Sequence, residues 1–229
     1  GNAIDTYSLS TAWDISTASF TRTLSLTSGN TGFTASLGLP NSIWFKPDGT
    51  KLYIADAGQD SIIQFSLSTA WEVSASSISY DSKVFNVNTA FGEANVESFI
   101  INDDGTKVIV SGSSVDKLVL LELSTAWDIS TAAYNSIDFN YAGNGSLLST
   151  SYPFAIAKSS DEQKLYILSN LGTLNQYTIG GIFLPTLQYL VATTNSGGQI
   201  DTTSWNDLNS LTADETLNDG ATYYAFSTD

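Results

Sequence analysis

Ser10-Thr11-Ala12-Trp13-Asp14 recurs with one change as Ser68-Thr69-Ala70-Trp71-Glu72 and again as Ser124-Thr125-Ala126-Trp127-Asp128. The tryptophans stand at positions 13, 71 and 127, so the steps between them are 58 and 56 residues. This period is too long for one coil of a solenoid and fits a unit of four strands with generous loops. The chain of 229 residues is therefore predicted to be a repeat protein.

Strand and hairpin signals accompany each copy of this phrase. Apolar residues recur at every second position before it, which is the period of a strand. These segments are residues 4–9, 62–67 and 118–123, with a more distant match at 174–179. Upstream, Asp48-Gly49 and Asp104-Gly105 each separate two β-rich runs, and 159–167 is a looser match. Asp-Gly predicts a hairpin, because glycine accepts the positive φ that such turns need.

The order of strands within a copy indicates the fold. The first arm of each hairpin is short and apolar, and we expect it to be the buried innermost strand; these arms are residues 42–45, 98–101 and 155–157. A strand rich in Ser and Thr follows the tryptophan near 19–24 and 134–139, and we expect it at the outer edge. The sequence therefore predicts an all-β fold of β-propeller-like blades, each of four antiparallel strands, in about three copies that form an incomplete ring.

Domain boundaries follow from the same alignment. The copies lie near 4–39, 40–95, 96–152 and 153–181, with the first and last partial, and 182–229 is predicted to be the start of a second β-rich module that is cut short. A closed propeller normally needs at least four blades. We expect the missing blades to precede Gly1, with a contribution from another chain and an open arc as the alternatives.

Composition excludes several classes of protein. A chain that is 42% hydrophobic and 12% aromatic is not a disordered one. Lys and Arg number 8 against 23 Asp and Glu, and the net charge of −15 repels nucleic acid and anionic membranes, so neither is expected as a partner. We expect no membrane insertion, because no apolar run is long enough to span a bilayer, and a leader upstream of Gly1 stays an open alternative.

Catalytic chemistry has little support in the sequence. Cysteine and histidine are absent, which removes disulfides, thiolate zinc ligands and the usual general base. Asp104-Gly105 does not fit an EF-hand, because the first and twelfth loop positions would be Ile100 and Ser111. A carboxylate pair could be drawn from Asp5, Asp56, Asp60, Glu93, Glu97 or Asp116, but the spacing singles out none of them. We therefore predict no catalytic residue, metal or cofactor, and do not expect an enzyme.

The repeated tryptophans are the candidate ligand-binding residues. Trp13, Trp71 and Trp127 would present aromatic faces at regular spacing, and such faces can stack on sugar rings. The alternative is structural, with each tryptophan packing between neighbouring blades or capping the outer hairpin, and the logic of repeats favours it.

A resemblance to a known group of proteins points to a function. The strings Leu52-Tyr53-Ile54-Ala55-Asp56 and Gln64-Phe65-Ser66-Leu67-Ser68-Thr69-Ala70-Trp71, together with the Asp-Gly-Thr-Lys turn, resemble the propeller-like repeats of large structural proteins in tailed phages, especially those of marine bacteria. The resemblance covers residues 4–179, and 196–229 looks like a module that often follows such repeats in phage fibre or virion proteins. It implies a virion or tail-fibre role and assigns no catalytic residue.

On these grounds we expect a non-enzymatic structural or receptor-binding protein on a virion surface or in an extracellular setting. Its expected partners are other virion or surface proteins and, through many weak contacts, host-surface glycans or proteins. It would be part of a larger chain or a homo-oligomer. The alternatives are a propeller hydrolase of lactonase or glycosidase type and a bacterial surface adhesin, because propellers serve all three roles.

Overall fold

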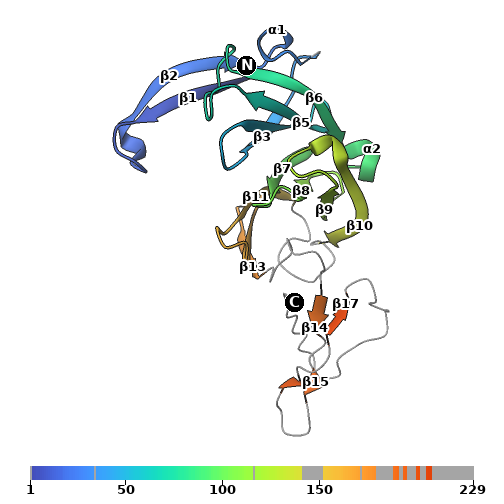
Figure 1. The fold of residues 1–229 in the computed structure, drawn as a ribbon. Coiled ribbons are helices and arrows are strands. Elements are labelled where there is room, and N and C mark those ends of the chain that lie inside the picture. The colour runs from blue at the N-terminus through green and yellow to red at the C-terminus, as the bar shows by residue number, and fades with distance from the viewer. Residues whose placement is uncertain are drawn as a thin grey trace. The chain divides into compact units, whose positions relative to one another are not determined.

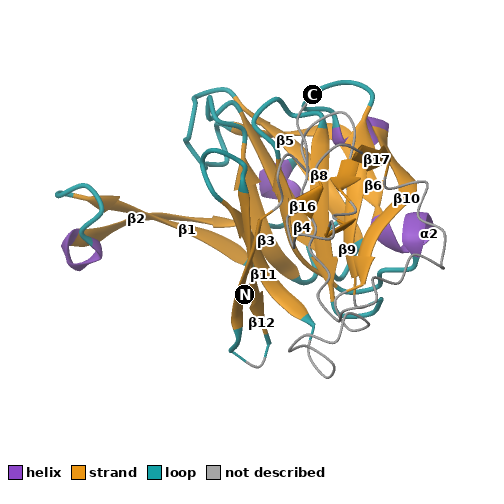
Figure 2. Cartoon of the chain, turned by 90° about the horizontal axis from the view of Figure 1, so that it is seen from below, coloured by secondary structure: helices purple, strands orange, loops and turns teal. Residues whose placement is uncertain are grey.

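The computed structural model describes residues 2–33, 35–115, 117–140, 152–170 and 172–178, and the backbone of four short strands beyond them. Contacts divide the chain into two compact units, Gly1–Ile156 with Ile167–Leu174 and Ala157–Tyr166 with Asn175–Asp229. Strands make up most of the described regular structure (Figures 1 and 2).

Four antiparallel sheets follow one another along the chain. The first holds β1 (Ala3–Leu9) and β2 (Ala18–Ser25). The second runs in the order β3 (Pro40–Phe45), β4 (Lys51–Asp56), β5 (Ser61–Leu67), β6 (Ile78–Asn86). The third consists of β7 (Val96–Ile101), β8 (Lys107–Gly112), β9 (Lys117–Leu123), β10 (Ala132–Asn140) in that order. The fourth holds β11 (Pro153–Lys158), β12 (Lys164–Ser169), β13 (Leu174–Thr178).

The remaining elements are short. Two helices, α1 (Ser28–Thr31) and α2 (Val87–Phe91), and two 3-10 turns, Ile15–Thr17 and Ile129–Thr131, lie between strands. Beyond residue 178, β14 (Gln188–Leu190) pairs with β17 (Trp205–Asp207), and β15 (Thr193–Thr194) pairs with β16 (Ile200–Asp201). Most of the predicted second module, 182–229, and residues 179–181 lie outside the described residues.

The predicted fold class is confirmed. The second and third sheets are four-stranded and antiparallel, in the sequence order expected for propeller-like blades. Their Asp-Gly hairpins join β3 to β4 and β7 to β8, with Phe45 opposite Leu52 and Ile101 opposite Val108. Gly49 and Gly105 have φ of 72° and 76°, the conformation for which glycine was expected at these turns.

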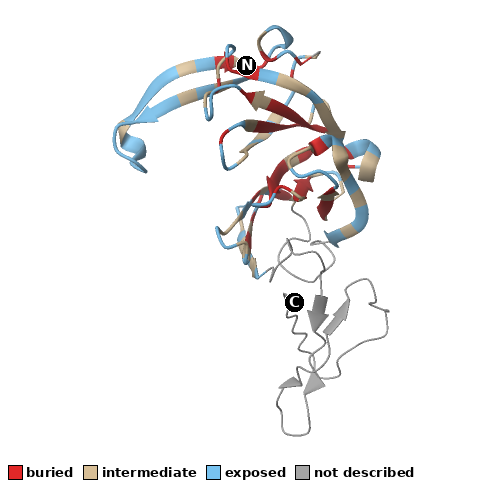
Figure 3. Cartoon of the chain, viewed as in Figure 1, coloured by how far each residue is buried: buried red, intermediate tan, exposed pale blue. Residues whose placement is uncertain are grey.

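The burial of the strands differs from the prediction in one respect. We expected the first arm of each hairpin to be a buried innermost strand. This holds for β7, which is buried except at Glu97, but β3 is exposed or half-buried along its length, whereas every residue of β4 after Lys51 is buried. β4 and β5, which are paired on both edges, are almost wholly buried (Figure 3). The apolar sequence of β3 therefore predicts more burial than the structure shows.

Two apolar clusters join successive sheets. One lies between the first and second sheets and includes Leu24, Leu26, Ile54 and Phe65. The other lies between the second and third sheets and includes Tyr53, Ile62, Phe99 and Leu121. Alternate residues of β4 and β5 thus face different neighbours, as the strand period requires. The second sheet therefore buries one face against the first sheet and the other against the third.

Polar contacts seat the third copy of the repeated phrase on the second sheet. We call residues 10–17, 68–77 and 124–131 tryptophan turns 1, 2 and 3. In turn 3, the Trp127 carbonyl accepts a hydrogen bond of 2.8 Å from the Tyr53 hydroxyl, and the Ile129 amide donates at 2.9 Å to Gln64 Oε1. Lys83 Nζ lies 2.6 Å from Asp128 Oδ2. These contacts fix the register between two neighbouring blades.

A substitution at this junction tests it. Tyr53 is fully buried, and burial, followed by the negative charges of Asp81 and Asp128, raises the pKa of its hydroxyl, which therefore stays protonated and able to donate. Replacing Tyr53 with Phe leaves the Trp127 carbonyl without this donor and should lower the free energy of unfolding by about 1 to 2 kcal/mol. Urea denaturation measures this. The matched control is Tyr7→Phe on exposed β1, which should change stability by under about 0.5 kcal/mol.

Candidate functional site

The inner strands of three sheets meet at a small cavity. Its volume is about 170 Å³, and its lining comes from the second and third residues of β3, β7 and β11: Asn41, Ser42, Glu97, Ser98, Phe154, Ala155. The repeat explains this convergence, because equivalent positions of successive inner strands point to one place. The site is therefore built from the same two positions in each of three inner strands.

Glu97 is the charged group of this lining. Its Oε2 accepts a hydrogen bond of 3.2 Å from Asn41 Nδ2, and its Oε1 accepts one of 3.0 Å from the Ser113 hydroxyl. The same Asn41 amide also donates to the Val96 carbonyl at 3.0 Å. The carboxylate is thus held from two sides, by a neighbouring blade and by its own, while it remains half-buried rather than enclosed.

Hydroxyl and aromatic groups complete the lining. Ser98 Oγ accepts a weak hydrogen bond of 3.4 Å from the Ile156 amide, which leaves the hydroxyl hydrogen free to donate elsewhere. Phe154 is 51% exposed, so part of its ring is open to a ligand. The lining includes no Lys or Arg. A carboxylate, hydroxyls and an aromatic face suit a neutral, hydroxyl-rich ligand and disfavour an anionic one.

Glu93 and Asp56, two further acids from the sequence, serve the backbone instead. Glu93 is buried and accepts hydrogen bonds from the amides of Asn95, Ser114 and Val115 at 2.8, 3.0 and 3.2 Å. Asp56 accepts from the amides of Leu39 and Gln59 at 3.2 and 3.0 Å. Each carboxylate therefore links the loop before the first strand of its sheet to the loop after the second strand.

The other acids lie apart from the cavity. Asp5 accepts a hydrogen bond from Thr23 on the first sheet, and Asp60 accepts one of 3.0 Å from Asn88. Asp116 lies outside the described residues. Sequence reasoning could not single out Glu97 from these six, because the signal is its place as second residue of an inner strand, which needs the strand register.

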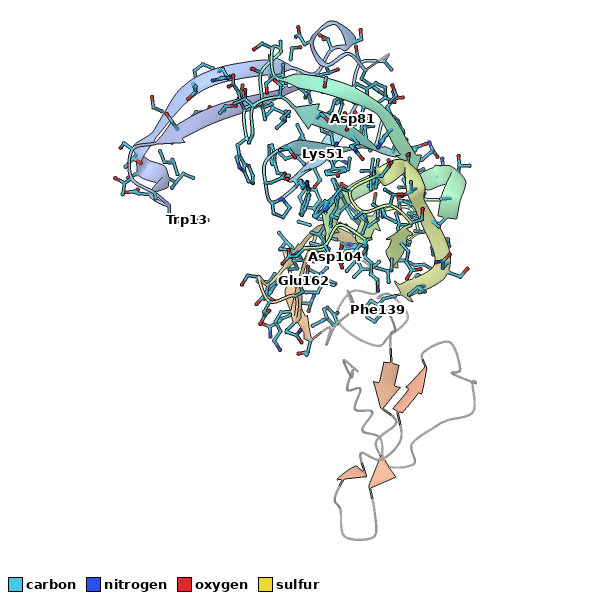
Figure 4. All side chains as sticks on the ribbon, in the orientation of Figure 1. Trp13, Lys51, Asp81, Asp104, Phe139 and Glu162 are labelled. Carbon is cyan, nitrogen blue, oxygen red and sulfur yellow. The ribbon has the colours of Figure 1, made fainter. Side chains whose placement is uncertain are left out.

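The three candidate tryptophans share a backbone conformation and differ in surroundings. Their φ values are 65°, 65° and 66°. Trp127 stacks on Trp44 at a centroid distance of 5.8 Å, with Lys46 Nζ 5.5 Å from its ring, whereas Trp71 is 56% exposed and Trp13 is 99% exposed. Figure 4 shows Trp13 at the far end of the β1–β2 ribbon. Whether they bind a ligand stays a prediction.

Within the part of the chain that the structure describes, no three Asp or Glu side chains gather closely enough to hold a metal ion. Among the same residues, no helix has the length and apolar character needed to cross a bilayer.

Comparison with known proteins yields fold likenesses alone. No family model matches the chain, and no curated protein matches it. A periplasmic gluconolactonase from Pseudomonas aeruginosa is 13% identical, with 90% of this chain and 63% of that chain covered and a TM-score of 0.47. A putative 6-phosphogluconolactonase from Bacteroides fragilis is 12% identical (89% and 51% covered, TM-score 0.47). A functionally unknown protein from Desulfotomaculum acetoxidans is 13% identical (88% and 48% covered, TM-score 0.46).

These comparisons correct one expectation. The chain spans between 48% and 63% of the length of the three proteins. Two of the three are named as lactonases, and this finding contradicts the expectation that the chain is not an enzyme. The resemblance to phage proteins, the virion location and the surface partners stay predictions that no comparison tests.

Proposed function

We propose that the cavity of the inner strands binds a small, uncharged, polyhydroxylated molecule of the sugar or sugar-lactone class, as part of a propeller-type hydrolase. The observation that carries this proposal is the Glu97 carboxylate, fixed by Asn41 and Ser113 beside the hydroxyls of Ser42 and Ser98. Carboxylates and serine hydroxyls pair well with vicinal hydroxyls of a sugar, and the Phe154 ring offers an apolar face for its C–H groups.

We propose that the Glu97 carboxylate also acts as the general base in hydrolysis of the bound ligand. Glu97 accepts a proton from a water molecule as that water adds to the carbonyl carbon of a bound lactone. The ring C–O bond then breaks, the proton passes to the departing ring oxygen, and an open hydroxy acid is released. Atoms and charges balance with water as the sole co-reactant. A fixed carboxylate at the ligand is what this step requires, because general-base catalysis depends first on geometry.

Charge favours a neutral substrate. The chain carries a net charge of −15, and the cavity lining presents a carboxylate without a Lys or Arg. A phosphorylated sugar would be repelled by both. We therefore expect the unphosphorylated lactone to be preferred over its 6-phosphate.

A kinetic experiment tests the proposal. The rate of ring opening of gluconolactone, corrected for the spontaneous reaction, is measured with the full chain and with Glu97→Gln, which keeps the shape of the side chain and removes its charge. We expect the variant to lose about 100-fold in catalysed rate. Asp5→Asn, an exposed variant with the same change of net charge, should retain the full rate.

Two results would count against this function. Equal rates for the natural chain and Glu97→Gln would remove the carboxylate from the reaction. Calorimetry that detects no binding of gluconolactone or glucose at millimolar concentration would remove the ligand class. Thermal unfolding of all variants shows whether a lost rate reflects a lost fold.

A further inference from the structure

The docked tryptophan turn provides a template for an interface. Turn 3 lies on the second sheet through Trp44, Tyr53, Gln64 and Lys83, as described above. Gln64 is held ready for this contact, because its Nε2 donates at 2.8 Å to Asp81, whose carboxylate is also 3.1 Å from Lys51 Nζ (Figure 4). The amide oxygen of Gln64 is thereby left facing the Ile129 amide.

Turn 1 has the same internal hydrogen bonds as turn 3, but its isoleucine is exposed rather than buried. In both turns the acid after the tryptophan accepts from the amide two residues on, at 3.0 Å for Asp14 and 3.1 Å for Asp128. In both, the last threonine hydroxyl donates at 2.8 Å to the carbonyl of that acid. Yet Ile15 is 85% exposed, whereas Ile129, its counterpart, is fully buried.

Exposed apolar side chains continue from turn 1 along one face of the first sheet. Tyr7 and Phe20 form an edge-to-face pair with centroids 5.7 Å apart, and both are exposed, as is Leu9. In the second sheet the equivalent pair, Phe65 and Tyr80, is packed into a core cluster against the sheet before it. The first sheet thus presents the face that a preceding blade covers elsewhere in the chain.

The fourth sheet carries two of the matching receptor positions, those of Tyr53 and Gln64, whereas Ala157 stands at the place of Trp44. The hydrogen bond from the Ser159 amide to the Lys164 carbonyl repeats the one from Lys46 to Lys51, so Lys164 stands where Lys51 stands and Tyr166 where Tyr53 stands. The bond from Lys164 Nζ to the Thr178 hydroxyl likewise repeats the one from Lys51 to Ser66.

This register fixes the positions on β13. Gln176 precedes Thr178 by two residues, as Gln64 precedes Ser66, so it occupies the place of Gln64. Gln176 is exposed and Tyr166 is half-buried. Leu168 and Leu174, which share this face by alternation, are also exposed. The place of Lys83 falls outside the described residues of the fourth sheet.

We propose that two copies of this chain associate head to tail, with tryptophan turn 1 and the first sheet of one copy seated on the Tyr166 and Gln176 face of the fourth sheet of the next. The contact repeats the two hydrogen bonds that Tyr53 and Gln64 make at the junction between the second and third sheets within one chain. Ile15 would donate its amide to Gln176, and the Trp13 carbonyl would accept from Tyr166. The interface is heterologous, so both faces remain available at the ends of a pair.

Crosslinking of single-cysteine variants tests this contact, because the chain has no cysteine of its own. Purified Ile15→Cys and Gln176→Cys are mixed and treated with a short bismaleimide. A product of two chains should form in the mixture. Ala75→Cys, on the exposed part of turn 2, replaces Ile15→Cys in the control and should give the background yield when mixed with Gln176→Cys. Trp13→Ala in the Ile15→Cys chain should reduce the yield to that background.

The response to salt and the site of crosslinking complete the test. Each copy carries a charge of −15, so repulsion opposes the pair and the yield should rise with ionic strength. A mixture that crosslinks no better than the Ala75→Cys control would overturn the proposal. So would a doubly substituted Ile15→Cys, Gln176→Cys chain that crosslinks efficiently at the mass of one chain, because docking would then occur within a single molecule.

Discussion

Replacing Glu93 with leucine should lower the free energy of unfolding by about 4 kcal/mol. The variant leaves the amides of Asn95, Ser114 and Val115 without the carboxylate that they share in the native chain, and this carboxylate is itself buried. Each unsatisfied donor costs about 1 to 3 kcal/mol. Urea denaturation followed by circular dichroism measures the loss.

The repeat supplies a compensating change for this variant. Val96 pairs with Gly112 as Pro40 pairs with Asp56, so Gly112 occupies the place of Asp56, and Leu37 occupies the place of Glu93. In the second sheet the loop amides donate to Asp56, at the end of β4. In the third sheet the equivalent amides donate to Glu93, in the loop before β7. A Cβ at Gly112 would overlap the Glu93 carboxyl group, so the acid can come from one side at a time.

We expect the double variant Glu93→Leu, Gly112→Asp to recover about half of the lost stability, although Gly112→Asp alone is destabilising. Recovery is partial because Asp56 uses one oxygen for two amides and its other oxygen is buried with no partner among the described residues, whereas Glu93 uses both oxygens. Additive losses in the two single variants and the double variant would show that the equivalence is wrong.

The different positions of Asp56 and Glu93 in the repeat are a feature that the sequence pattern does not predict. The period of the tryptophans, the alternation of β5 and β9 and the Asp-Gly turns were sufficient for blades of four antiparallel strands. The alternation and the turns act locally, within hairpins. Glu93 and Asp56 both accept hydrogen bonds from loop amides, although they stand at different positions of the repeat. In the fourth sheet Asn170 is the acceptor, and its Oδ1 accepts at 3.2 Å from the Tyr152 amide. No pattern in a single sequence reports such a substitution.

The candidate site was hidden for a related reason. Glu97 was one of six acids, and nothing in its neighbourhood along the chain distinguishes it. Its role arises because three inner strands bring Asn41, Glu97 and Phe154 to one cavity, and the contact between Asn41 and Glu97 spans 56 residues. Conversely, the tryptophans stood out in the sequence, but their surroundings depend on the preceding sheet, which Trp127 has and Trp13 lacks within the described residues.

Gly105→Ala should be the second most damaging change, with a loss of about 3 kcal/mol. Gly105 has φ of 76°, and its carbonyl accepts a hydrogen bond of 2.9 Å from the Trp127 amide. A Cβ at this position would overlap the Trp127 ring, which in turn stacks on Trp44. Alanine therefore adds backbone strain of about 1 to 2 kcal/mol and also forces the indole out of its packing at the junction of two sheets.

Gly172→Ala separates these two contributions. Gly172 has φ of 80°, but no atom of the described residues lies within 4 Å of a Cβ built there, so this variant adds the backbone strain alone and should cost about 1 kcal/mol. Near-ultraviolet circular dichroism provides an independent measurement, because the stacked pair of Trp44 and Trp127 should lose its signal in Gly105→Ala and keep it in Gly172→Ala. If both variants lost the same stability and kept the same spectrum, the tryptophan would not be packed against its turn glycine, and the register of turn 3 on the second sheet would have to be reassigned.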